Sequence, residues 1–279
     1  MDVSRYLARV GYAGSRALSL ATLNAIVSRH VQAIPFENLD VLLGQPISID
    51  VEAVEDKLVR RQRGGYCFEH NTLLLHVLGE LGFSAKALSA RSRYMQLERT
   101  QLPRTHMFLR VDWGSEPYLV DAGFGGFSPP AALRIELETR QETSHEPRRI
   151  VAEGRWQELG LRAPDAVLVH QVYFADAWHD LYEFTLEEMP LADRVMGNWY
   201  TSAHPSSHFR RELRVARATR EGRVTLLDRE LTRRSAGGVE KRTVASQSEL
   251  RWILAEDFGL SIPKETRFPN PGLADLPRD

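Results

Sequence analysis

The stretch R-G-G-Y-C-F-E-H-N holds the only cysteine of the 279-residue sequence, Cys67, two residues after a glycine pair. Apolar residues recur at helical spacing after it, and Gly82 suits a C-terminal cap, so a helix is predicted from about residue 67 to 81. The first turn of a helix carries roughly half a positive charge, which favours the nucleophilic thiolate over the thiol. Cys67 is therefore a candidate nucleophile, and a small buried hydrophobe is the alternative interpretation.

A nucleophilic thiol needs a base and a group that orients that base. His106 opens the strand pattern H-M-F-L-R-V, and Asp121 closes the pattern E-P-Y-L-V-D after the short connection D-W-G-S. A hairpin that turns between Trp113 and Gly114 places His106 opposite Asp121, where cross-strand Cβ atoms lie ~4.5–5.5 Å apart. The other face of this hairpin would carry Met107, Leu109, Tyr118 and Val120, with Leu109 opposite Tyr118.

Cys67, His106 and Asp121 together meet the requirements of a catalytic triad. The thiolate attacks, the imidazole takes and returns protons, and the carboxylate fixes the imidazole tautomer. Two simpler interpretations stay open: His106 and Asp121 form an ordinary surface pair, or Asp121 caps the loop G-F-G-G near it. Two more histidines near the thiol, His70 and His76, are expected at exposed positions of the helix.

The loop after Asp121 holds three glycines, Gly123, Gly125 and Gly126. The backbone N–H groups of such a loop can bind a phosphate, or the loop can be a flexible turn. No Gly-Lys-Ser/Thr follows, so the loop lacks the pattern of a nucleotide-hydrolase phosphate loop. It also lacks the spacing and the following helix of a dinucleotide-binding glycine motif.

The remaining patterns are helical at first and then strand-rich. Helices are predicted at 19–34, within 47–59 with Asp50 as cap, and at 247–258, where Ser246 and Glu249 suit a capping box. Strands are predicted at 86–94, 106–111, 116–121, 151–157, 166–174 and 179–184, and a further hairpin at 213–219 and 223–228. Residues 134–149 are polar and irregular and are expected to form a surface loop.

The composition is that of a soluble globular protein, with 43% hydrophobic and 26% charged residues. A formal net charge of −1 gives no electrostatic attraction to nucleic acid. No segment reaches the ~20 apolar residues of a membrane helix, and the N-terminus has no signal pattern. A single cysteine forms no internal disulfide, which fits a reducing compartment. We expect a cytoplasmic protein of two or three packed sub-domains, with no metal, membrane or nucleic-acid partner.

Six motifs, in this order, resemble those of the arylamine N-acetyltransferases. They extend from near the N-terminus to residue 205 and include all three candidate catalytic residues. The motifs are V-G-Y-A-G (10–14), I-P-F-E-N-L-D (34–40), R-G-G-Y-C-F-E-H-N (63–71), T-H-M-F-L-R-V (105–111), D-A-G-F-G-G (121–126) and N-W-Y-T-S-A-H-P (198–205). The last motif departs from the family at Ala203, where many members have threonine.

The resemblance implies an α+β fold with a papain-like Cys-His-Asp core. A helical N-terminal domain (1–84) would carry the nucleophile, an antiparallel β-barrel domain (85–190) the histidine and aspartate, and an α/β lid domain (191–279) the C-terminal helix. The implied reaction is ping-pong acetyl transfer from acetyl-CoA to arylamines, arylhydrazines or N-hydroxyarylamines through an acetyl-Cys intermediate. The resemblance assigns Cys67 as nucleophile, His106 as base and Asp121 as orienting carboxylate. A homo-oligomer is left open.

Contacts with the substrates follow from residue types within these motifs. The acceptor pocket is expected to include Phe36, Phe124 and Tyr200, whose rings can shield acetyl-Cys from water and stack on an aryl group. The backbone of Gly123, Gly125 and Gly126 is expected to contact the cofactor, with Thr105 as a polar neighbour. Tyr66 and Phe68 are expected in the core, and Glu37, Arg63 and Glu69 in a structural ion-pair network.

Three other functions compete with acetyl transfer. An amide synthase that cyclises a thioester-bound polyketide would use the same triad. A Cys–His–Asp hydrolase of the protease or transglutaminase type would pass its acyl group to water. A binding protein without catalysis would only capture aromatic amines or coenzyme A. The triad favours an enzyme and the flanking motifs favour a transferase over a hydrolase, but no single residue separates the transferase from the synthase.

Overall fold

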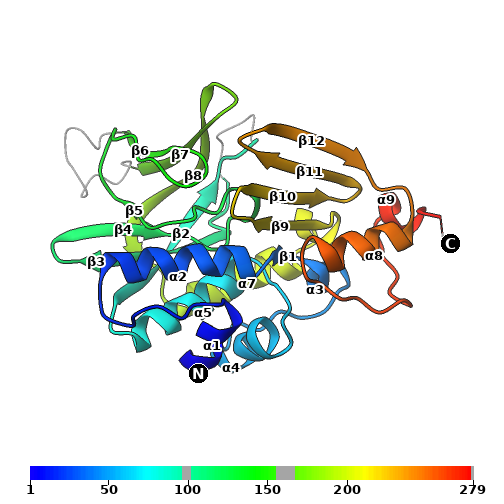
Figure 1. Ribbon diagram of the computed structural model, residues 1–279, viewed down its shortest axis with the longest axis horizontal. Helices are drawn as coiled ribbons and strands as arrows, with labels where there is room; N and C mark the ends of the chain where they lie inside the picture. The colour runs from blue at the N-terminus through cyan, green and yellow to red at the C-terminus, as the bar shows by residue number, and fades with distance from the viewer. Residues whose placement is uncertain (96–101, 155–166, 278–279) are drawn as a thin grey trace.

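The computed structural model describes residues 1–95, 102–154 and 167–277. Its first part is helical and lies below the two sheets in Figure 1. The helices of this part are α1 (Val3–Arg9), α2 (Leu20–Ala33), α3 (Leu39–Leu42), α4 (Val51–Glu55) and α5 (Cys67–Glu80). The helix predicted at 19–34 is confirmed as α2, which is capped by the Ser19 hydroxyl and ends before Pro35.

The helix predicted within 47–59 is shorter and less regular than expected. It begins at Val51, and Asp50 occupies the cap position without a side-chain cap bond. From Asp56 to Arg60 the chain continues as a π-helical turn that buries Lys57. This turn points Lys57 at the start of α5, which becomes important for the site below.

The middle of the chain forms a nearly closed, seven-stranded antiparallel barrel. The strands are β2 (Ser84–Ser92), β3 (His106–Trp113), β4 (Glu116–Val120), β5 (Leu133–Arg134), β6 (Arg148–Glu153), β7 (Val167–Phe174) and β8 (Ala177–Glu188). Their order in the sheet is β5-β4-β3-β2-β8-β7-β6. Isolated bridges from Leu137 to Ile150 and from Gln141 to Arg148 connect the segment after β5 to β6.

The predicted strands of the barrel exist with shifted ends. The strand predicted at 151–157 begins at Arg148, and residues 155–157, like residue 166, lie outside the described residues. The prediction of a surface loop at 134–149 is wrong at both ends. Arg134 belongs to β5, whereas Arg148 opens β6 fully buried and donates to the Phe127 carbonyl oxygen at 2.9 Å. A buried guanidinium with backbone partners cannot be distinguished from a solvated one by residue type.

The last part of the chain adds a second sheet and three helices. Its elements are α7 (Leu191–Ala203), β9 (Arg214–Ala218), β10 (Gly222–Leu227), β11 (Glu230–Ser235), β12 (Gly238–Thr243), α8 (Gln247–Glu256) and α9 (Pro271–Ala274). The predicted hairpin is confirmed as β9–β10, and β1 (Phe36–Glu37) extends this sheet by pairing with β9. Ser246 caps α8 as predicted. Glu249, however, accepts from the Ala245 N–H and not from Ser246, so the capping box is incomplete.

Three hydrophobic clusters hold these parts together. One joins α1, α2 and α5 to the face of the barrel that carries Met107, Leu109 and Val120. A second fills the barrel interior around Phe108 and Leu119, and a third lies between the second sheet, α8 and α3. Two of the clusters include residues from both sides of a predicted domain limit, so the limits at 84/85 and 190/191 stay a prediction.

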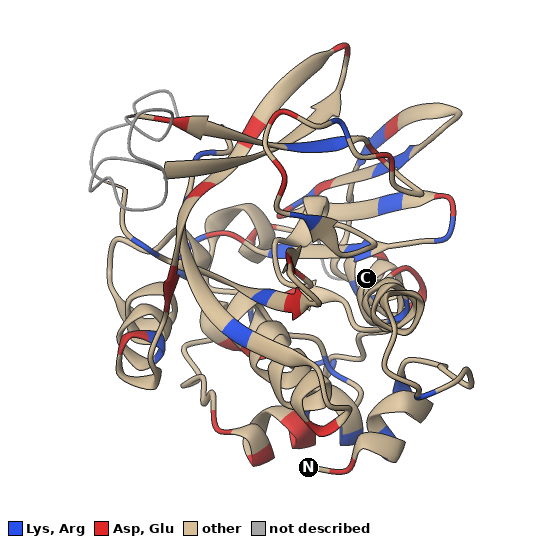
Figure 2. Cartoon of the chain, turned by 90° about the vertical axis from the view of Figure 1, so that its left-hand side faces the viewer, with Lys and Arg blue, Asp and Glu red and all other residues tan. Residues whose placement is uncertain are grey.

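Charged residues of both signs are interspersed over helices and strands, as Figure 2 shows. Within the described ranges, no helix has the length and apolar character needed to span a bilayer. The same part of the chain contains no group of three or more histidine, cysteine or acidic side chains arranged to hold a metal ion.

Candidate active site

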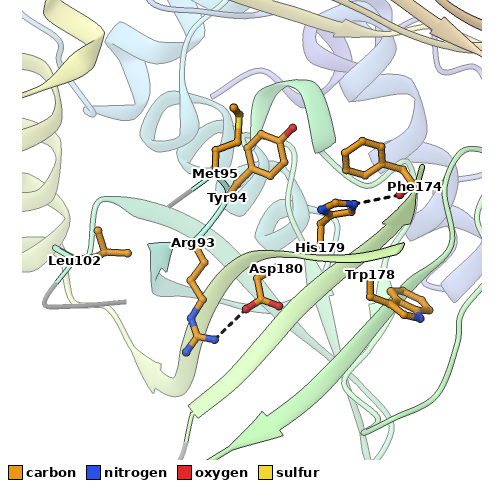
Figure 3. Close-up of a pocket in the computed structure, with 8 residues that line it drawn as sticks. All are labelled: Arg93, Tyr94, Met95, Leu102, Phe174, Trp178, His179 and Asp180. Carbon is orange, nitrogen blue, oxygen red and sulfur yellow. Dashed lines mark hydrogen bonds and ion pairs between the residues drawn. The ribbon is translucent and has the colours of Figure 1, made fainter. Parts of the chain in front are cut away.

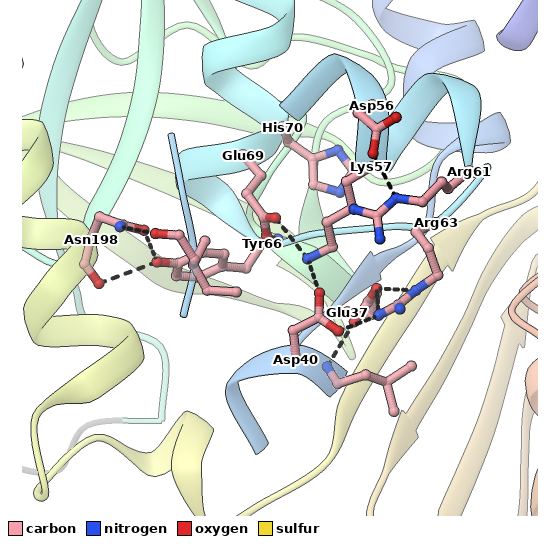
Figure 4. Close-up of polar contacts among 12 residues, drawn as sticks. Glu37, Asp40, Asp56, Lys57, Arg61, Arg63, Tyr66, Glu69, His70 and Asn198 are labelled. Atoms are coloured by element: carbon pink, nitrogen blue, oxygen red, sulfur yellow. Dashed lines mark hydrogen bonds and ion pairs between the residues drawn. The ribbon is translucent and has the colours of Figure 1, made fainter. Parts of the chain in front are cut away.

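Helix α5 begins at Cys67, and its first turn is fixed by Glu69. The Glu69 carboxylate accepts a hydrogen bond from the Tyr66 backbone N–H at 3.0 Å, so it satisfies one of the free N–H groups at the helix start. Lys57, from the π-helical turn, donates to the same carboxylate at 2.7 Å (Figure 4). The nucleophile candidate therefore opens a helix whose start is held by a buried ion pair.

This ion pair belongs to the network that the sequence predicted for Glu37, Arg63 and Glu69. Arg63 bonds Glu37 at 2.7 Å and Asp40 at 2.9 Å, and Lys57 bonds Asp40 at 2.8 Å. Burial raises the pKa of Glu69 to about 7, although the charge and hydrogen bond of Lys57 oppose this rise. The predicted structural role is confirmed, and the network fixes the R-G-G turn that leads to Cys67.

The β3–β4 hairpin differs from the predicted register by two residues. Leu109 lies opposite Val120 and not Tyr118, because the ladder continues to Trp113 and Glu116 and the turn is the pair 114–115. Gly114 has a φ of 61°, which glycine adopts easily and which permits this tight turn. A shift of two residues keeps every side chain on its predicted face, so His106 and Asp121 still point into the barrel.

His106 and Asp121 meet in spite of that shift. The carboxylate Oδ2 lies 2.7 Å from His106 Nε2. Strand β4 ends at Val120, so Asp121 stands just beyond the ladder, diagonal to His106, and the imidazole spans the extra distance. Asp121 also accepts from the Gly123 N–H at 2.9 Å and from the Asn71 amide at 3.3 Å. The surface-pair interpretation is wrong, because Asp121 is fully buried and His106 is 5% exposed.

The electrostatics of this pair favour a charged imidazole. Burial alone lowers the pKa of His106, but the charge and hydrogen bond of Asp121, together with Cys67, raise it to about 10. Burial raises the pKa of Asp121, and the His106 charge and the donors around the carboxylate lower it below its ordinary value. Because Nε2 is bound to Asp121, Nδ1 is the ring nitrogen left for Cys67.

Cys67 is 3% exposed, but its surroundings are polar as well as apolar. Its Sγ lies 3.7 Å from the Thr105 carbonyl oxygen, and the side chain is among the groups that raise the pKa of His106. Gly123 lies directly against it, since a Cβ at Gly123 would stand 2.5 Å from Cys67 Cα. Burial agrees with a packed hydrophobe, whereas the neighbouring imidazole leaves the nucleophile interpretation open.

Aromatic rings surround the histidine. The Phe124 ring packs edge-on against His106 with centroids 5.0 Å apart, and Tyr182 lies 4.9 Å from the same ring. Phe36 lies beside Gly125, where an added Cβ would stand 3.4 Å from its ring. Tyr200 instead stacks on His204 and bonds Ser206 at the end of α7, so no contact in the described structure ties it to this group.

The remaining predicted residues separate into packed and loop positions. Tyr66 and Phe68 are fully buried, as predicted. The Gly123 N–H is used by Asp121, and Gly126 lies against Thr225. Gly125 has a φ of 70° and opens the 3-10 turn Gly125–Phe127. The structure of the loop alone therefore explains why glycines occupy these positions. Contact of the loop with a cofactor stays a prediction.

Sequence reasoning missed two residues of the site and misplaced a third. Asn71 lies one helical turn after Cys67, and that spacing could have predicted its bond to Asp121. Tyr182 had no signal, because it reaches His106 from β8, a strand distant in sequence that is separated from β3 by β2 in the sheet. His70 was expected to be exposed, but it is fully buried, since every residue from Cys67 to Leu74 is covered by neighbouring elements. His76 is exposed, as predicted.

A hollow of about 500 Å³ opens away from these residues, between the end of β2 and the β7–β8 hairpin (Figure 3). Its lining residues are Arg93, Tyr94, Met95, Leu102, Phe174, Trp178, His179 and Asp180. Neither Cys67, His106 nor Asp121 lines it, so the chemistry of the site is assigned from the hydrogen bonds and not from this hollow.

Comparisons with known proteins agree with this arrangement. A model of the N-acetyltransferase family matches residues 19–267. The arylamine N-acetyltransferase of Mycolicibacterium smegmatis is 41% identical over 266 residues, which cover 94% of this chain and 93% of that protein. The chain belongs to the arylamine N-acetyltransferase family. The resemblance predicted from the six motifs is confirmed.

Solved structures of arylamine N-acetyltransferases share the whole fold. The M. smegmatis enzyme superposes with a TM-score of 0.87 at 37% identity, covering 99% of this chain and 100% of that chain. The Mycobacterium marinum enzyme in complex with CoA gives 0.86 at 38% identity, with 92% of each chain covered. The predicted α+β fold, with a helical N-terminal region and an antiparallel barrel, is confirmed by these structures and by the strand order of the chain itself.

Proposed function

We propose that the protein transfers an acetyl group from acetyl-CoA to the nitrogen of arylamines, arylhydrazines or N-hydroxyarylamines through an acetyl-Cys67 intermediate. The observation that carries the mechanism is the buried 2.7 Å contact between His106 and Asp121, next to Cys67, which helps to raise the pKa of the same imidazole. The CoA complex of the M. marinum relative supports the donor, and the names of the relatives support the acceptor class.

The first half-reaction moves the acetyl group to the enzyme. The cycle begins with the Cys67 proton already on His106, and the sulfur of this thiolate–imidazolium pair attacks the thioester carbonyl carbon. The bond between that carbon and the sulfur of coenzyme A breaks, and the imidazolium returns its proton to the departing thiolate. Asp121 stabilises the imidazolium and holds its Nε2, so that Nδ1 faces the sulfur. Backbone N–H groups near Cys67 stabilise the oxyanion of the intermediate.

The second half-reaction releases the acetyl group to the amine. The amine nitrogen attacks the acetyl-Cys67 carbonyl carbon, His106 takes one proton from that nitrogen, and the sulfur of Cys67 leaves as thiolate. The thiolate and the imidazolium that open the cycle are thereby restored. Water competes with the amine for the acetyl group. The low exposure of Cys67 and the rings of Phe124 and Tyr182 around His106 protect the intermediate from hydrolysis.

The contacts with the substrates are part of the same proposal. Phe36 and Phe124 form the acceptor pocket with Tyr200, and Thr105 and the glycine loop contact the cofactor. The cytoplasm is the proposed location, because acetyl-CoA is available there.

Two-substrate kinetics tests the covalent step. Because coenzyme A leaves before the amine attacks, double-reciprocal plots at several fixed amine concentrations should give parallel lines. Intersecting lines would require a complex that holds both substrates at once and would contradict the acetyl-Cys67 route. An amide synthase with the same triad should give no turnover with acetyl-CoA and a simple arylamine, so turnover itself separates the two functions.

A further inference from the structure

A second chain of buried polar groups connects the first turn of α5 to α1 and α2. The Tyr6 hydroxyl lies 2.8 Å from His30 Nδ1, and His30 Nε2 lies 2.8 Å from His70 Nδ1. His70 Nε2 lies 3.1 Å from the Pro35 carbonyl oxygen. Tyr6, His30 and His70 are all fully buried and come from α1, α2 and α5. We call this group the Tyr6–His30–His70 chain.

The Pro35 carbonyl oxygen, at one end of the Tyr6–His30–His70 chain, fixes the direction of every hydrogen bond in that chain. A carbonyl oxygen only accepts, so His70 Nε2 carries a hydrogen and donates to Pro35. In a neutral ring, His70 Nδ1 is then an acceptor, and His30 Nε2 must donate to it. His30 Nδ1 is in turn an acceptor, which makes the Tyr6 hydroxyl the donor. One neutral arrangement therefore satisfies all three bonds.

An added proton would break this arrangement. A charged His70 would carry a hydrogen at Nδ1, and His30 would have to reverse its tautomer to accept it. The Tyr6 hydroxyl would then have to accept from His30, and its own buried hydrogen would lose its acceptor. The result would be a buried charge and an unsatisfied donor, both of which are costly in a low-dielectric interior.

The charges that face the two rings do not compensate for such a proton. His30 faces Arg9 and His70, and His70 faces Lys57 on one side and Asp121 on the other. Burial and these neighbours hold the pKa of His30 well below its ordinary value, and burial lowers the pKa of His70 to about 4. Both rings are neutral over the range in which an unburied histidine titrates.

The Pro35 carbonyl connects the chain to the nucleophile. The same oxygen accepts from the Gly65 N–H at 3.4 Å, and Glu37 N–H donates to the Gly65 carbonyl at 2.7 Å. Gly64 lies so close to Pro35 that an added Cβ would stand 2.2 Å from this oxygen. His70 thus fixes the segment against which the glycine turn before Cys67 packs.

We propose that His70 is a positioning residue for Cys67: the Tyr6–His30–His70 chain, with its one permitted direction, holds the Pro35 carbonyl and so sets the glycine turn that places the sulfur. This inference rests on the proposed function, because it assigns a purpose to the placement of Cys67. The ion pairs of Figure 4 hold the same turn from its other side, through Glu69 and Lys57.

Histidine ring NMR tests the chain in the unmodified protein. Long-range 1H–15N correlation of histidine-labelled protein should show His30 and His70 as Nε2–H tautomers that do not titrate between about pH 5 and 8. The variants His30→Gln and His70→Gln assign the two signals. A ring found in the Nδ1–H form, or titrating within that range, would overturn the proposal. None of these signals depends on acetyl transfer, so this result is independent of the proposed function.

Single-turnover acetylation of Cys67 by acetyl-CoA tests the positioning role. His70→Leu removes both ring nitrogens and should slow acetylation by at least about tenfold, since small misplacements of reacting groups cost 10- to 100-fold. His70→Gln keeps a donor and an acceptor and should stay within about threefold of the natural protein. His76→Leu, on the exposed side of the same helix, is the matched control and should leave the rate unchanged.

Equal rates for His70→Leu and His70→Gln, whether slow or normal, would overturn the positioning role. If His70→Leu does not fold, Tyr6→Phe removes only the first donor of the chain. The His30 ring should then keep its Nε2–H tautomer, because the Pro35 carbonyl oxygen still fixes that tautomer through His70, and a change to the Nδ1–H tautomer would contradict the assigned direction. If the natural protein gains no acetyl group, the proposed function is contradicted. The tautomers found by NMR do not depend on that result.

Discussion

His70 and His106 lie near the same helix start and are both buried, but near neutral pH the structure favours a neutral ring for His70 and a charged ring for His106. His106 bonds the Asp121 carboxylate at 2.7 Å, and its pKa rises to about 10. His70 bonds a carbonyl oxygen and a neutral imidazole, and its pKa falls to about 4. Burial lowers the pKa of both rings, so the difference comes from one carboxylate in direct contact.

In the proposed mechanism, this difference separates a reactive side of α5 from a supporting side. On the barrel side, the imidazole of His106 can exchange a proton with Cys67 while Asp121 balances its charge. On the side of α1 and α2, the hydrogen bonds of His70 permit a single neutral tautomer, so this ring exchanges no proton. In the proposed mechanism, histidine serves in chemistry in one place and in rigid support in another, and the formal charge of its partner decides which.

The largest expected effect comes from making His106 resemble His70. Asp121→Asn keeps the shape of the side chain but removes the charge that stabilises the imidazolium. We expect kcat/KM for acetyl transfer to an arylamine to fall by about 10³- to 10⁴-fold, as for a triad that loses its carboxylate. Initial rates with acetyl-CoA measure this loss. Asp112→Asn, on β3 and paired with Arg110, is the matched control and should stay within about twofold. A loss below about tenfold in Asp121→Asn would remove the carboxylate from the mechanism.

The next effect is the alkaline loss of stability due to His106. Its pKa is about 10 in the folded protein and near 6.5 in the unfolded chain, so the folded protein binds more protons between these values. The stabilisation is fully present below about pH 6.5 and is lost as the pH rises through about 10, with a total on the order of 5 kcal/mol. Urea unfolding from pH 6.5 to 10 should show this loss in the natural protein and a flatter profile in Asp121→Asn. Parallel profiles would contradict the charged pair.

A smaller effect of opposite direction belongs to His70. Its pKa is about 4 in the folded protein, so the unfolded chain binds more protons between about pH 4 and 6.5. The stability contributed by the neutral ring is present above about pH 6.5 and is lost as the pH falls toward 4, by about 3 kcal/mol. His30 acts in the same direction. His70→Gln should reduce the acid dependence of the unfolding free energy. An unchanged acid profile in that variant would mean that the ring is not held neutral.

The positions of Cys67, His106 and Asp121 could be predicted from the sequence because their signals are local. The glycine pair and the helical period place Cys67 at a helix start, and alternating strands bring His106 and Asp121 to one face of a hairpin. The register was wrong by two residues because the turn formed at 114–115. The face was still correct, since a shift of two residues preserves the alternation of side chains.

The supporting residues could not be predicted, because their partners come from distant parts of the chain. His70 looks like a surface residue within α5, but α2 supplies His30 to its ring, and α1 supplies Tyr6 to the ring of His30. Helix α7 is a second element in which the burial of the side chains could not be predicted from the sequence. It buries Asn198 and Thr201 and exposes Leu191, Val195, Met196 and Trp199, so its amphipathic pattern is inverted with respect to the core. The polar Asn198 is buried because it bonds Tyr66 and the Ile47 carbonyl oxygen.

The most direct test of the central claim is the intact mass of the protein after incubation with acetyl-CoA alone. The proposed mechanism predicts the gain of one acetyl group in the absence of any amine, its loss when an arylamine is added, and no gain in Cys67→Ala. A natural protein whose mass does not change, or a Cys67→Ala variant that still gains the acetyl group, would contradict the assignment of Cys67 as the nucleophile of a Cys67–His106–Asp121 triad.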